Sequence, residues 1–433
     1  MAKKLRVLFV SGELIAGDLA FRLVKEGCEV KLYIADKSRK DCFENMVEKV
    51  SNWRKELDWV GKDGLIVFDD VGYGKIQDNL RKKGYQVVGG CAVSDKLEQD
   101  RDFGQWILHD HGMTVLQSQN FISMDKAIDF VRSSKKKWVV KQNDHTSMLN
   151  YVGEMDDGSD VINLINSYKN NKNIKSINLQ ERAIGIEIGL ARYFNGNDWV
   201  GPVEINIEHK SLYNDNIGPK TAEMGTVMWY EENENFRLYQ ETLGKLKLFL
   251  QSINFKGDVD IDFIVNEKHA YPLEFTTRFG SPAVHLQDKI HISKWKDFLL
   301  AIARGEEFNL KYKKEKGIVV SIAIPPFPYK SINNSYYSSG VDIYFKKKLS
   351  KEEREMIHFE EVSFDNETGR YHVAGSNGYV LYISGTGDAV NDAREKVYGL
   401  VKNIVIPKMF YRTDIGLDFV NRDFEMLKKW GWV

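Results

Sequence analysis

The sequence predicts a multidomain chain with a doubly wound α/β domain at its N-terminus, antiparallel sheets in its middle and a small α+β domain at its C-terminus. Three observations support this fold class. The chain has 433 residues, which is too long for one ordinary hydrophobic core. Over residues 5–88, short apolar runs alternate with helical patterns. From about residue 183, apolar and polar residues alternate as in antiparallel strands.

The N-terminal unit, residues 1–94, begins with the buried-strand pattern LRVLFV and a turn of small residues. A helical stretch and a second strand follow, so the chain opens with a strand–helix–strand unit. Gly84 ends the next helix. Strands are predicted over residues 5–10, 30–34, 64–69 and 85–88, and helices over residues 18–25 and 75–83.

The second unit is predicted over residues 95–310, with a smaller part at about 115–182. It opens with one helix over residues 95–112, and the apolar face of that helix should consist of Leu97, Phe103, Trp106 and Ile107. Strands are predicted over residues 138–141, 178–181, 184–194, 258–265 and 270–277, the last two as a hairpin.

The third unit is predicted over residues 311–433. The charged stretch 311–316 is interpreted as a linker, although a solvated surface loop explains it equally well. Apolar strands at 317–324 and 378–384 and a helix at 388–404 then indicate a small α+β domain.

Composition narrows the class of protein. Apolar residues make up 42% and charged residues 28% of a chain with a formal charge of −1, so neither nucleic acid nor a membrane surface is expected as the main partner. Cys28, Cys42 and Cys91 form no CxxC pair, which argues against disulfides and structural zinc. The sequence has no signal-peptide pattern and no apolar run near the roughly 20 residues of a membrane span. A cytoplasmic location is therefore expected.

Charged residues gather on the predicted hairpin. Asp260 and Asp262 share one face of a strand, Glu274 lies on the next strand, and Arg278 follows four residues later. Carboxylates brought together repel one another unless a cation neutralises them, and magnesium on nucleotide phosphates is a common solution. Taken alone, however, Asp260 and Asp262 fit the solvent face of an ordinary strand about equally well.

Four segments resemble one known family. PLEFTTRFGSP (272–282) resembles the signature EFNARFGDPE of glycinamide ribonucleotide synthetase, also called phosphoribosylamine–glycine ligase, and NIGPKTAEMGT (216–226) resembles its GPNTGGMG motif. FYRTDIG (410–416) matches the closing FYRxDIG, and LEQDRDFG (97–104) falls where the family has LEGSKxFA. All four occur in the family's order, over roughly residues 5–420. The resemblance implies ATP-grasp domains in the middle of the chain.

The resemblance also implies roles for individual residues. Taken alone, Lys141 and Glu187 fit surface positions on strands; in the family's order they correspond to nucleotide ligands. Arg278 would stabilise an acyl-phosphate and the tetrahedral intermediate, and Glu274 would serve in catalysis and as a metal ligand. The implied nucleotide-binding residues are Arg101 and Lys141 for the phosphates, Glu181 for the adenine and Glu187 for the ribose. The implied metal ligands are Glu274, Asp262 and Thr276, and the implied substrate residues are Gly12, Glu13, Gly218, Pro219, Thr221 and Gly225.

Three departures from the family bear on the substrate. The family's GxGGREH turn reads SGELIAGDLA here (11–20), so an Arg-Glu-His set is replaced by a turn that carries Glu13 and Asp18. The glycine-rich covering loop is replaced by residues 142–153. In the metal motif the usual Asn is Thr276, a poorer ligand, and the later Asp and Glu are Ser281 and Ala283.

The resemblance therefore predicts an ATP-dependent ligase of purine biosynthesis that requires Mg²⁺, with Mn²⁺ as an alternative. It would join a carboxylate, by default glycine, to an amine on a phosphorylated sugar or nucleotide. Two alternatives stay open: the same chemistry on a diverged acceptor such as a modified nucleotide, and a non-catalytic ATP-binding sensor. The expected partners are small molecules, and the expected state is a monomer or a small homo-oligomer.

Overall fold

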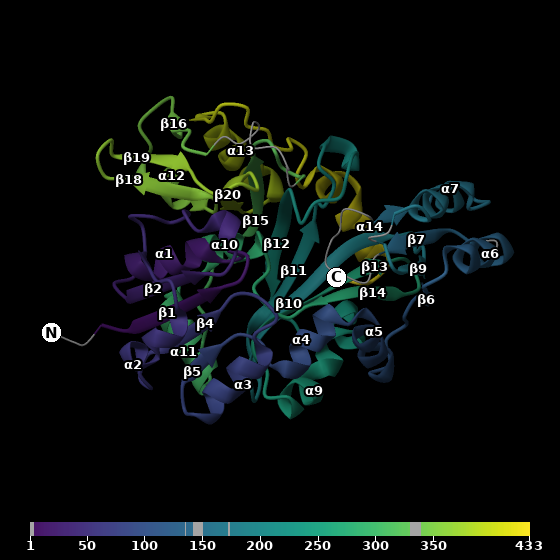
Figure 1. Ribbon diagram of the computed structural model, residues 1–433, viewed down its shortest axis with the longest axis horizontal. Coiled ribbons are helices and arrows are strands. Elements are labelled where there is room, and N and C mark those ends of the chain that lie inside the picture. The colour runs from purple at the N-terminus through teal and green to yellow at the C-terminus, as the bar shows by residue number, and fades with distance from the viewer. Residues whose placement is uncertain (1–3, 135, 142–149, 172–173, 330–338) are drawn as a thin grey trace.

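The computed structural model describes residues 4–134, 136–141, 150–171, 174–329 and 339–433. It holds a five-stranded parallel sheet, a four-stranded sheet and an eight-stranded antiparallel sheet (Figure 1), so the predicted α/β and α+β class is confirmed. Cys28, Cys42 and Cys91 are buried and free, as the sequence predicted. Within the described ranges no helix is long and apolar enough to cross a bilayer.

The N-terminal sheet has the strand order β3-β2-β1-β4-β5, with every neighbouring pair parallel. Its central strand is buried on both faces: Val7 and Phe9 belong to the core that includes Leu19 of the first helix, and Leu8 packs in a second core on the other side. All predicted elements of this unit are present. The strands are β1 (Arg6–Ser11), β2 (Glu29–Ile34), β3 (Glu48–Lys49), β4 (Leu65–Phe68) and β5 (Gln86–Val88), and the helices are α1 (Gly17–Lys25), α2 (Leu57–Val60) and α3 (Gly74–Lys82).

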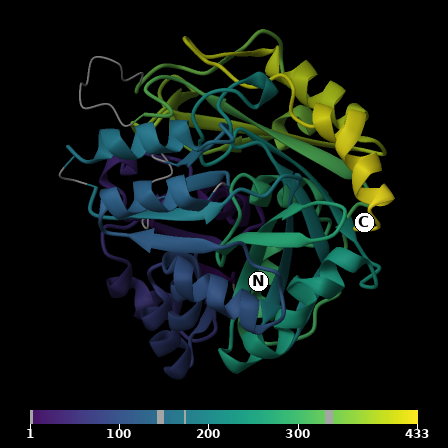
Figure 2. The same ribbon diagram turned by 90° about the vertical axis from the view of Figure 1, so that its right-hand side faces the viewer.

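Residues 118–181, called the lid below, form a separate small sheet with the strand order β6-β9-β7-β8. Its two helices and strands share a core of their own around the fully buried Trp138. Figure 2 looks onto the lid, with the C-terminal helices (yellow) above it. Its elements are β6 (Ser118–Phe121), α6 (Met124–Ser134), β7 (Trp138–Lys141), β8 (Tyr151–Val152), α7 (Ser159–Tyr168) and β9 (Ile177–Glu181).

The large sheet, called the central sheet below, has the order β14-β13-β10-β11-β12-β15-β20-β17. The hairpin predicted from the sequence is present as β13 and β14. The last three strands follow residue 311, so the C-terminal segment extends the central sheet. The strands are β10 (Ile186–Asn195), β11 (Trp199–Glu208), β12 (Gly225–Glu231), β13 (Lys256–Val265), β14 (Ala270–Thr276), β15 (Lys316–Ala323), β17 (Ile357–Phe359) and β20 (Tyr379–Gly387).

The remaining elements are helices and two separate two-stranded pairs. The helices are α8 (Arg237–Glu241), α9 (Lys247–Ser252), α10 (Ala283–Ile290), α11 (Trp295–Arg304), α12 (Lys351–Glu355), α13 (Val390–Val401) and α14 (Phe424–Lys429). In the two short pairs, β16 (Tyr344–Phe345) lies antiparallel to β21 (Ile404–Val405), and β18 (Val362–Asp365) lies antiparallel to β19 (Arg370–Val373).

The single helix predicted over residues 95–112 is wrong. Asp100 has an extended backbone (φ −114°, ψ 92°), which divides the segment into α4 (Ala92–Gln99) and α5 (Arg101–Asp110). The Asp100 side chain accepts a hydrogen bond from the Phe103 amide and so caps the second helix. Because the break turns the second helix, Trp106 is 56% exposed and does not share a buried face with Leu97. The break also places Arg101 in the first turn of α5.

Candidate active site

The candidate site lies on one face of the central sheet, where polar residues recur at every second position of two strands. Between these strands, β10 carries Gly189 and Ala191, and each lies in register with one polar residue on either side. A Cβ atom on Gly189 would lie 2.1 Å from the Asn206 Oδ1, so the small residues of β10 leave space for the polar rows. The rows are Asp258, Asp260 and Asp262 on β13 and Glu204, Asn206 and Glu208 on β11.

Lys210 is the main counter-charge of these acids. Its Nζ lies 2.8 Å from Asp262 Oδ2, 2.9 Å from Glu208 Oε2, 3.1 Å from Glu187 Oε1 and 3.6 Å from Glu274 Oε1. The attraction of four carboxylates outweighs the cost of burial, and the pKa of Lys210 lies well above its usual value. The ammonium group is therefore charged throughout the physiological pH range.

The sequence analysis missed Lys210, although a signal for it was present. Lys210 continues the spacing of two that begins at Glu204 and runs through Asn206 and Glu208. A lysine at the end of an alternating acidic row shares the face of that row.

The structure answers the question that the sequence left open for Asp260 and Asp262. Both are buried, so the interpretation of these residues as the solvent face of a strand is wrong.

The acids near Lys210 differ in charge. Burial, together with the neighbouring Asp262, raises the pKa of Asp260 to about 7. The Glu274 side chain on β14 is 48% exposed; the desolvation that remains opposes its ionisation, but Lys210, Lys141 and Arg101 outweigh it and lower the pKa of that carboxyl to about 2. Glu274 is therefore ionised at physiological pH, and it lies at the outer end of the site.

Three cations surround Glu274. Arg101 Nη2 lies 3.6 Å from Glu274 Oε2, and Lys210 approaches the other carboxylate oxygen. Lys141, at the end of β7 in the lid, is the third; burial and the charge of Arg101 lower its pKa to about 7. The Arg101 Nη1 atom is buried and has no hydrogen-bond partner among the described residues. A buried donor without a partner and a destabilised ammonium both favour an anionic ligand at this place.

Arg278 connects this cluster to the N-terminal sheet. Its Nε donates to Glu98 Oε1 at 2.9 Å and lies 3.9 Å from Asp70 Oδ1. Glu98 also accepts the Thr277 amide, which fixes the backbone beside Arg278. The guanidinium group thus stands between Glu274 and the carboxyl end of β4, where ligands of open α/β sheets usually bind.

The amides of the first βα turn, where Gly12 and Glu13 are implied substrate residues, are bound to a side chain of the protein. The amides of Gly12 and Ala16 both donate to the buried carboxyl group of Asp69, which also accepts the Ser11 hydroxyl at 2.8 Å. Burial and the neighbouring Asp70 raise the pKa of Asp69 to about 7. A side chain of the protein therefore fills the place that a phosphate would take.

The sequence analysis places Asp18 on this turn with Glu13, but the Asp18 carboxylate points into the protein interior. Asp18 is buried and contacts Arg22 and His358, which lies on β17 of the central sheet. The carboxylates near the turn are Glu13, which is exposed, and Asp70, whose Oδ2 would lie 2.3 Å from a Cβ atom on Gly12.

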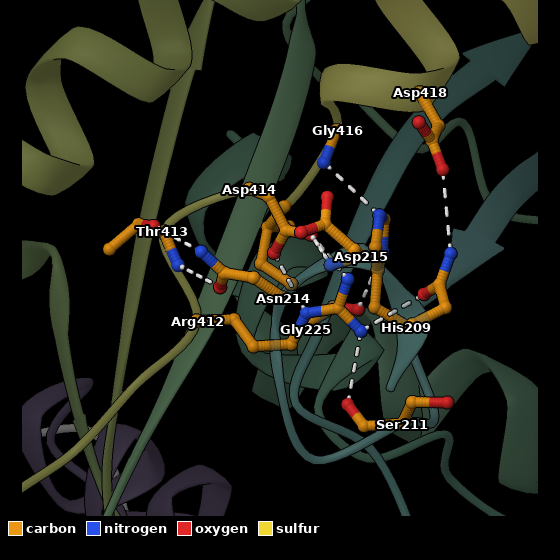
Figure 3. Close-up of polar contacts among 12 residues, drawn as sticks. His209, Ser211, Asn214, Asp215, Gly225, Arg412, Thr413, Asp414, Gly416 and Asp418 are labelled. Atoms are coloured by element: carbon orange, nitrogen blue, oxygen red, sulfur yellow. Dashed lines mark hydrogen bonds and ion pairs between the residues drawn. The ribbon is translucent and has the colours of Figure 1, made fainter. Parts of the chain in front are cut away.

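The closing FYRTDIG segment holds the loop that carries Lys210 (Figure 3). Arg412 donates to the Ser211 carbonyl and to Asn216 Oδ1, both at 3.0 Å, and pairs with Asp414 at 2.7 Å. Asn214 and Thr413 exchange two hydrogen bonds beside it. Segments about 200 positions apart in the chain are thereby fixed to each other.

His209 forms a second connection between the same segments (Figure 3). Burial, and then the charge of Arg412, lower its pKa to about 4, so the ring is neutral. Nε2 accepts the Gly416 amide and Nδ1 donates to the Gly225 carbonyl, each at 3.2 Å. Because His209 directly precedes Lys210, the lysine backbone is anchored on both sides.

The predicted substrate loop supports the same backbone. The Thr221 amide and hydroxyl both donate to the Lys210 carbonyl, at 2.7 and 2.9 Å. Pro219 accepts the Leu212 amide at 3.0 Å. Gly218 (φ 91°) and Gly225 (φ 157°) both have backbone angles that favour glycine.

The other predicted residues lie around this centre. Glu181 ends β9 and pairs with Lys136 at 2.8 Å, at the point where the lid joins the central sheet. Thr276 lies in register opposite Asp260, and Glu274 opposite Asp262. Most of the predicted covering loop, at 142–149, lies outside the described residues.

The acids fit a divalent cation. Glu187, Glu208 and Asp262 each bring one carboxylate oxygen to within 4.8 Å of the others. The Asp262 Oδ1 atom is buried and has no hydrogen-bond partner among the described residues. Carboxylate oxygens are the ligands that Mg²⁺ and Mn²⁺ prefer.

The site thus combines a lid that ends in Lys141, a central sheet with a carboxylate cluster, and a neighbouring parallel sheet. No protein-family model matches the chain. It is similar to phosphoribosylamine–glycine ligase of Clostridium acetobutylicum, with 21% identity over 385 residues, 86% of this chain and 87% of the relative.

Solved structures show the same likeness. Phosphoribosylamine–glycine ligase from Thermotoga maritima superimposes with a TM-score of 0.71 at 17% identity, covering 95% of this chain and all of that one. Biotin carboxylase from Campylobacter jejuni gives a TM-score of 0.66 at 10% identity, with 99% of each chain covered. The predicted resemblance to ATP-grasp ligases of the phosphoribosylamine–glycine ligase type is thereby confirmed, and so is the predicted fold class.

The anchoring role of Arg412 predicts a large effect on stability. Replacing Arg412 with Met leaves Asp414 and the Ser211 carbonyl without their partner in a buried place. We expect the free energy of unfolding to fall by about 3 kcal/mol or more, measured by chemical denaturation. The control is Arg422→Met in the same region, since Arg422 is exposed and its ion pairs should contribute less than about 1 kcal/mol. Equal losses in the two variants would contradict the anchoring role.

Proposed function

We propose that this chain is an ATP-dependent carboxylate–amine ligase that acts through an acyl-phosphate. The observation that carries the proposal is the position of Glu274, a carboxylate beside Asp262 and surrounded by Arg101, Lys141 and Lys210. A metal-bridged polyphosphate requires both charges in one place, carboxylates for the cation and fixed cations for the phosphates. The relatives named as phosphoribosylamine–glycine ligases support the same chemistry.

Each residue then has a role. Arg101 and Lys141 hold the phosphates of ATP, Glu181 lies beside the adenine, and Glu187 accepts hydrogen bonds from the ribose. Glu274 and Asp262, with Thr276 next to them, hold Mg²⁺ or Mn²⁺. When bound, the metal neutralises the phosphate oxygens during transfer.

The reaction has two steps. An oxygen of the substrate carboxylate attacks the γ-phosphorus, and ADP leaves, so that an acyl-phosphate forms. The amine of the acceptor then attacks the acyl carbon, loses a proton, and expels phosphate. Arg278 would bind the oxyanion of the tetrahedral intermediate; its contacts with Glu98 and Asp70, which hold the guanidinium group near the N-terminal turn, support this role. The default donor is glycine.

The acceptor differs from that of the family in this proposal. Asp69 already accepts hydrogen bonds from the amides of the first turn, and Asp70 and Glu13 add carboxyl groups nearby. A doubly charged phosphate would be repelled there by about 1 kcal/mol or more per carboxylate. The acceptor therefore presents a cationic or hydroxyl-rich group to this turn, or its phosphate is held elsewhere, with residues 218–225 as the favoured place. Action in the cytoplasm, as a monomer or small homo-oligomer, is part of the same proposal.

The test is an assay of the purified protein with ATP, Mg²⁺ and matched panels of amino acids and amine acceptors. Release of ADP and phosphate that depends on one acid and one amine supports the ligase. A protein that binds ATP but releases no phosphate with any pair is instead a nucleotide sensor. Glu274→Ala should abolish ADP formation while circular dichroism stays unchanged, and normal turnover in that variant would remove Glu274 from the metal site.

The pKa of Lys141 predicts that ATP binding depends on pH. At pH 8 an ammonium with a pKa of about 7 is mostly neutral, and a phosphate bound beside it raises that pKa. Binding at pH 8 should take up close to one proton at this site, and affinity should fall as the pH rises above 7. Calorimetry in buffers of different ionisation enthalpy measures the uptake. In Lys141→Arg the guanidinium stays charged, so the additional uptake should disappear; equal uptake in both proteins would contradict the assignment.

Substitution of Arg278 should lower turnover much more than it lowers ATP affinity. Arg278→Lys should leave ATP affinity within a few-fold of the wild type, because the residue faces Glu98 and Asp70 on the acceptor side. Turnover should fall by roughly 100-fold, the loss typical of one transition-state donor. Steady-state kinetics together with equilibrium nucleotide binding make the comparison. A parallel loss of ATP affinity would place Arg278 in the nucleotide site.

The first turn predicts the choice of acceptor. With glycine as donor, phosphoribosylamine should be a poorer acceptor than an amine with a cationic or hydroxyl-rich group, compared by kcat/KM. Asp70→Asn should narrow this difference, because it removes one of the repelling carboxylates. If phosphoribosylamine is the best acceptor by a wide margin, the proposed change of substrate is wrong and the relatives' reaction applies.

A further inference from the structure

The Lys210 ammonium group lies among the same carboxylates that could hold a metal ion. Glu187, Glu208 and Asp262 are the three acids whose oxygens lie within 4.8 Å of one another, and Lys210 Nζ is within 3.1 Å of an oxygen from each. Its fourth contact, at 3.6 Å, is to Glu274. The lysine thus already supplies a positive charge where a divalent cation would bind.

A dication and an ammonium cannot share this place at low cost. Each would be within a few ångströms of the other in a partly buried site, where like charges repel strongly. The cluster therefore has two ways to be neutralised, by the lysine or by the metal. A metal that enters must drive the ammonium away from at least some of these carboxylates.

Lys210 has a side chain that could move and a backbone that is held. Its carbonyl accepts two hydrogen bonds from Thr221, and its neighbours His209 and Ser211 are bonded to the closing segment (Figure 3). The side chain is 21% exposed, and a lysine stem rotates about four bonds. Its displaced ammonium group would remain beside Glu274, where Arg101 and Lys141 also lie.

We propose that Lys210 is an exchangeable counter-ion that makes metal binding depend on nucleotide. In the nucleotide-free protein, Lys210 neutralises the cluster and keeps divalent metal affinity low. With ATP and metal bound, Asp262 and Glu274 would hold the metal and the Lys210 ammonium would pair with a phosphate oxygen, so neither charge would be left unpaired. This inference rests on the proposed nucleotide site, but it concerns metal binding and not turnover.

The test measures Mn²⁺ binding from the free-ion signal in electron paramagnetic resonance, with and without ADP. Wild-type protein should bind Mn²⁺ weakly alone and at least about 30-fold more tightly with ADP, after correction for Mn²⁺ bound by ADP in solution. Lys210→Met should bind Mn²⁺ at least about 30-fold more tightly than the wild type without nucleotide. Lys210→Arg keeps the charge and should resemble the wild type in that measurement.

Lys245→Met is the control. This lysine lies outside the cluster, and its Nζ donates to the Gly112 carbonyl at 3.0 Å. Its removal should leave nucleotide-free Mn²⁺ affinity unchanged. If circular dichroism shows that Lys210→Met does not fold, the Mn²⁺ affinities of the wild type with and without ADP still test the proposal, and Lys210→Arg is compared with them.

Two results would overturn the proposal. One is wild-type protein that binds Mn²⁺ equally well with and without ADP. The other is a folded Lys210→Met variant with unchanged nucleotide-free affinity. Failure of the ligase assay would have a different signature, because a protein that binds nucleotide without catalysis still shows the exchange between lysine and metal.

Discussion

The structure depends on one constraint, the neutralisation of negative charge on a single face of the central sheet. Two acidic rows face each other across Gly189 and Ala191, and Lys210 is the cation that contacts their outer end. Buried carboxylates without a counter-charge are unfavourable enough to take up protons, and the raised pKa of Asp260 shows this tendency further in. Helix α5, the lid and the segment after β14 then bring Arg101, Lys141 and Arg278 to the same site.

This constraint explains why the closing segment of the chain contacts the loop that carries Lys210. The closing segment contributes no group to the acidic cluster, yet Arg412 and Gly416 hold the residues on either side of Lys210. A cation that must contact several carboxylates needs a fixed origin for its side chain, which a surface loop alone does not provide. The match of FYRTDIG to the family's last motif therefore has a physical reason: it fixes a loop that lies in the middle of the sequence.

Much of the fold could be predicted because hydrophobic periodicity is local. The N-terminal strands, the β13–β14 hairpin and α13 lie where apolar patterns placed them. The break at Asp100 was missed, because an aspartate inside an otherwise helical pattern looks like a surface residue until its side chain caps the next helix. Asp18 was misplaced for a different reason, since its partner His358 is 340 positions away and no local pattern indicates it.

The part of the site that lies on a single hairpin could be predicted from the sequence. The part where several segments of the chain meet could not. Asp262 and Glu274 could be paired from a short hairpin, but the charge at the first turn could not be inferred from the turn alone. Asp69 comes from β4 and fills that turn from the neighbouring strand, so the amides of Gly12 and Ala16 already have an anion. Because the amide donors of this turn are already bound to Asp69, the groups that remain to contact a ligand are the carboxyls of Asp70 and Glu13. The turn that departs from the family's motif thus lies on the side of Asp70 and Arg278, where the proposed acceptor would bind, while the cluster around Glu274 has both the cations and the carboxylates that a metal-bound phosphate would require.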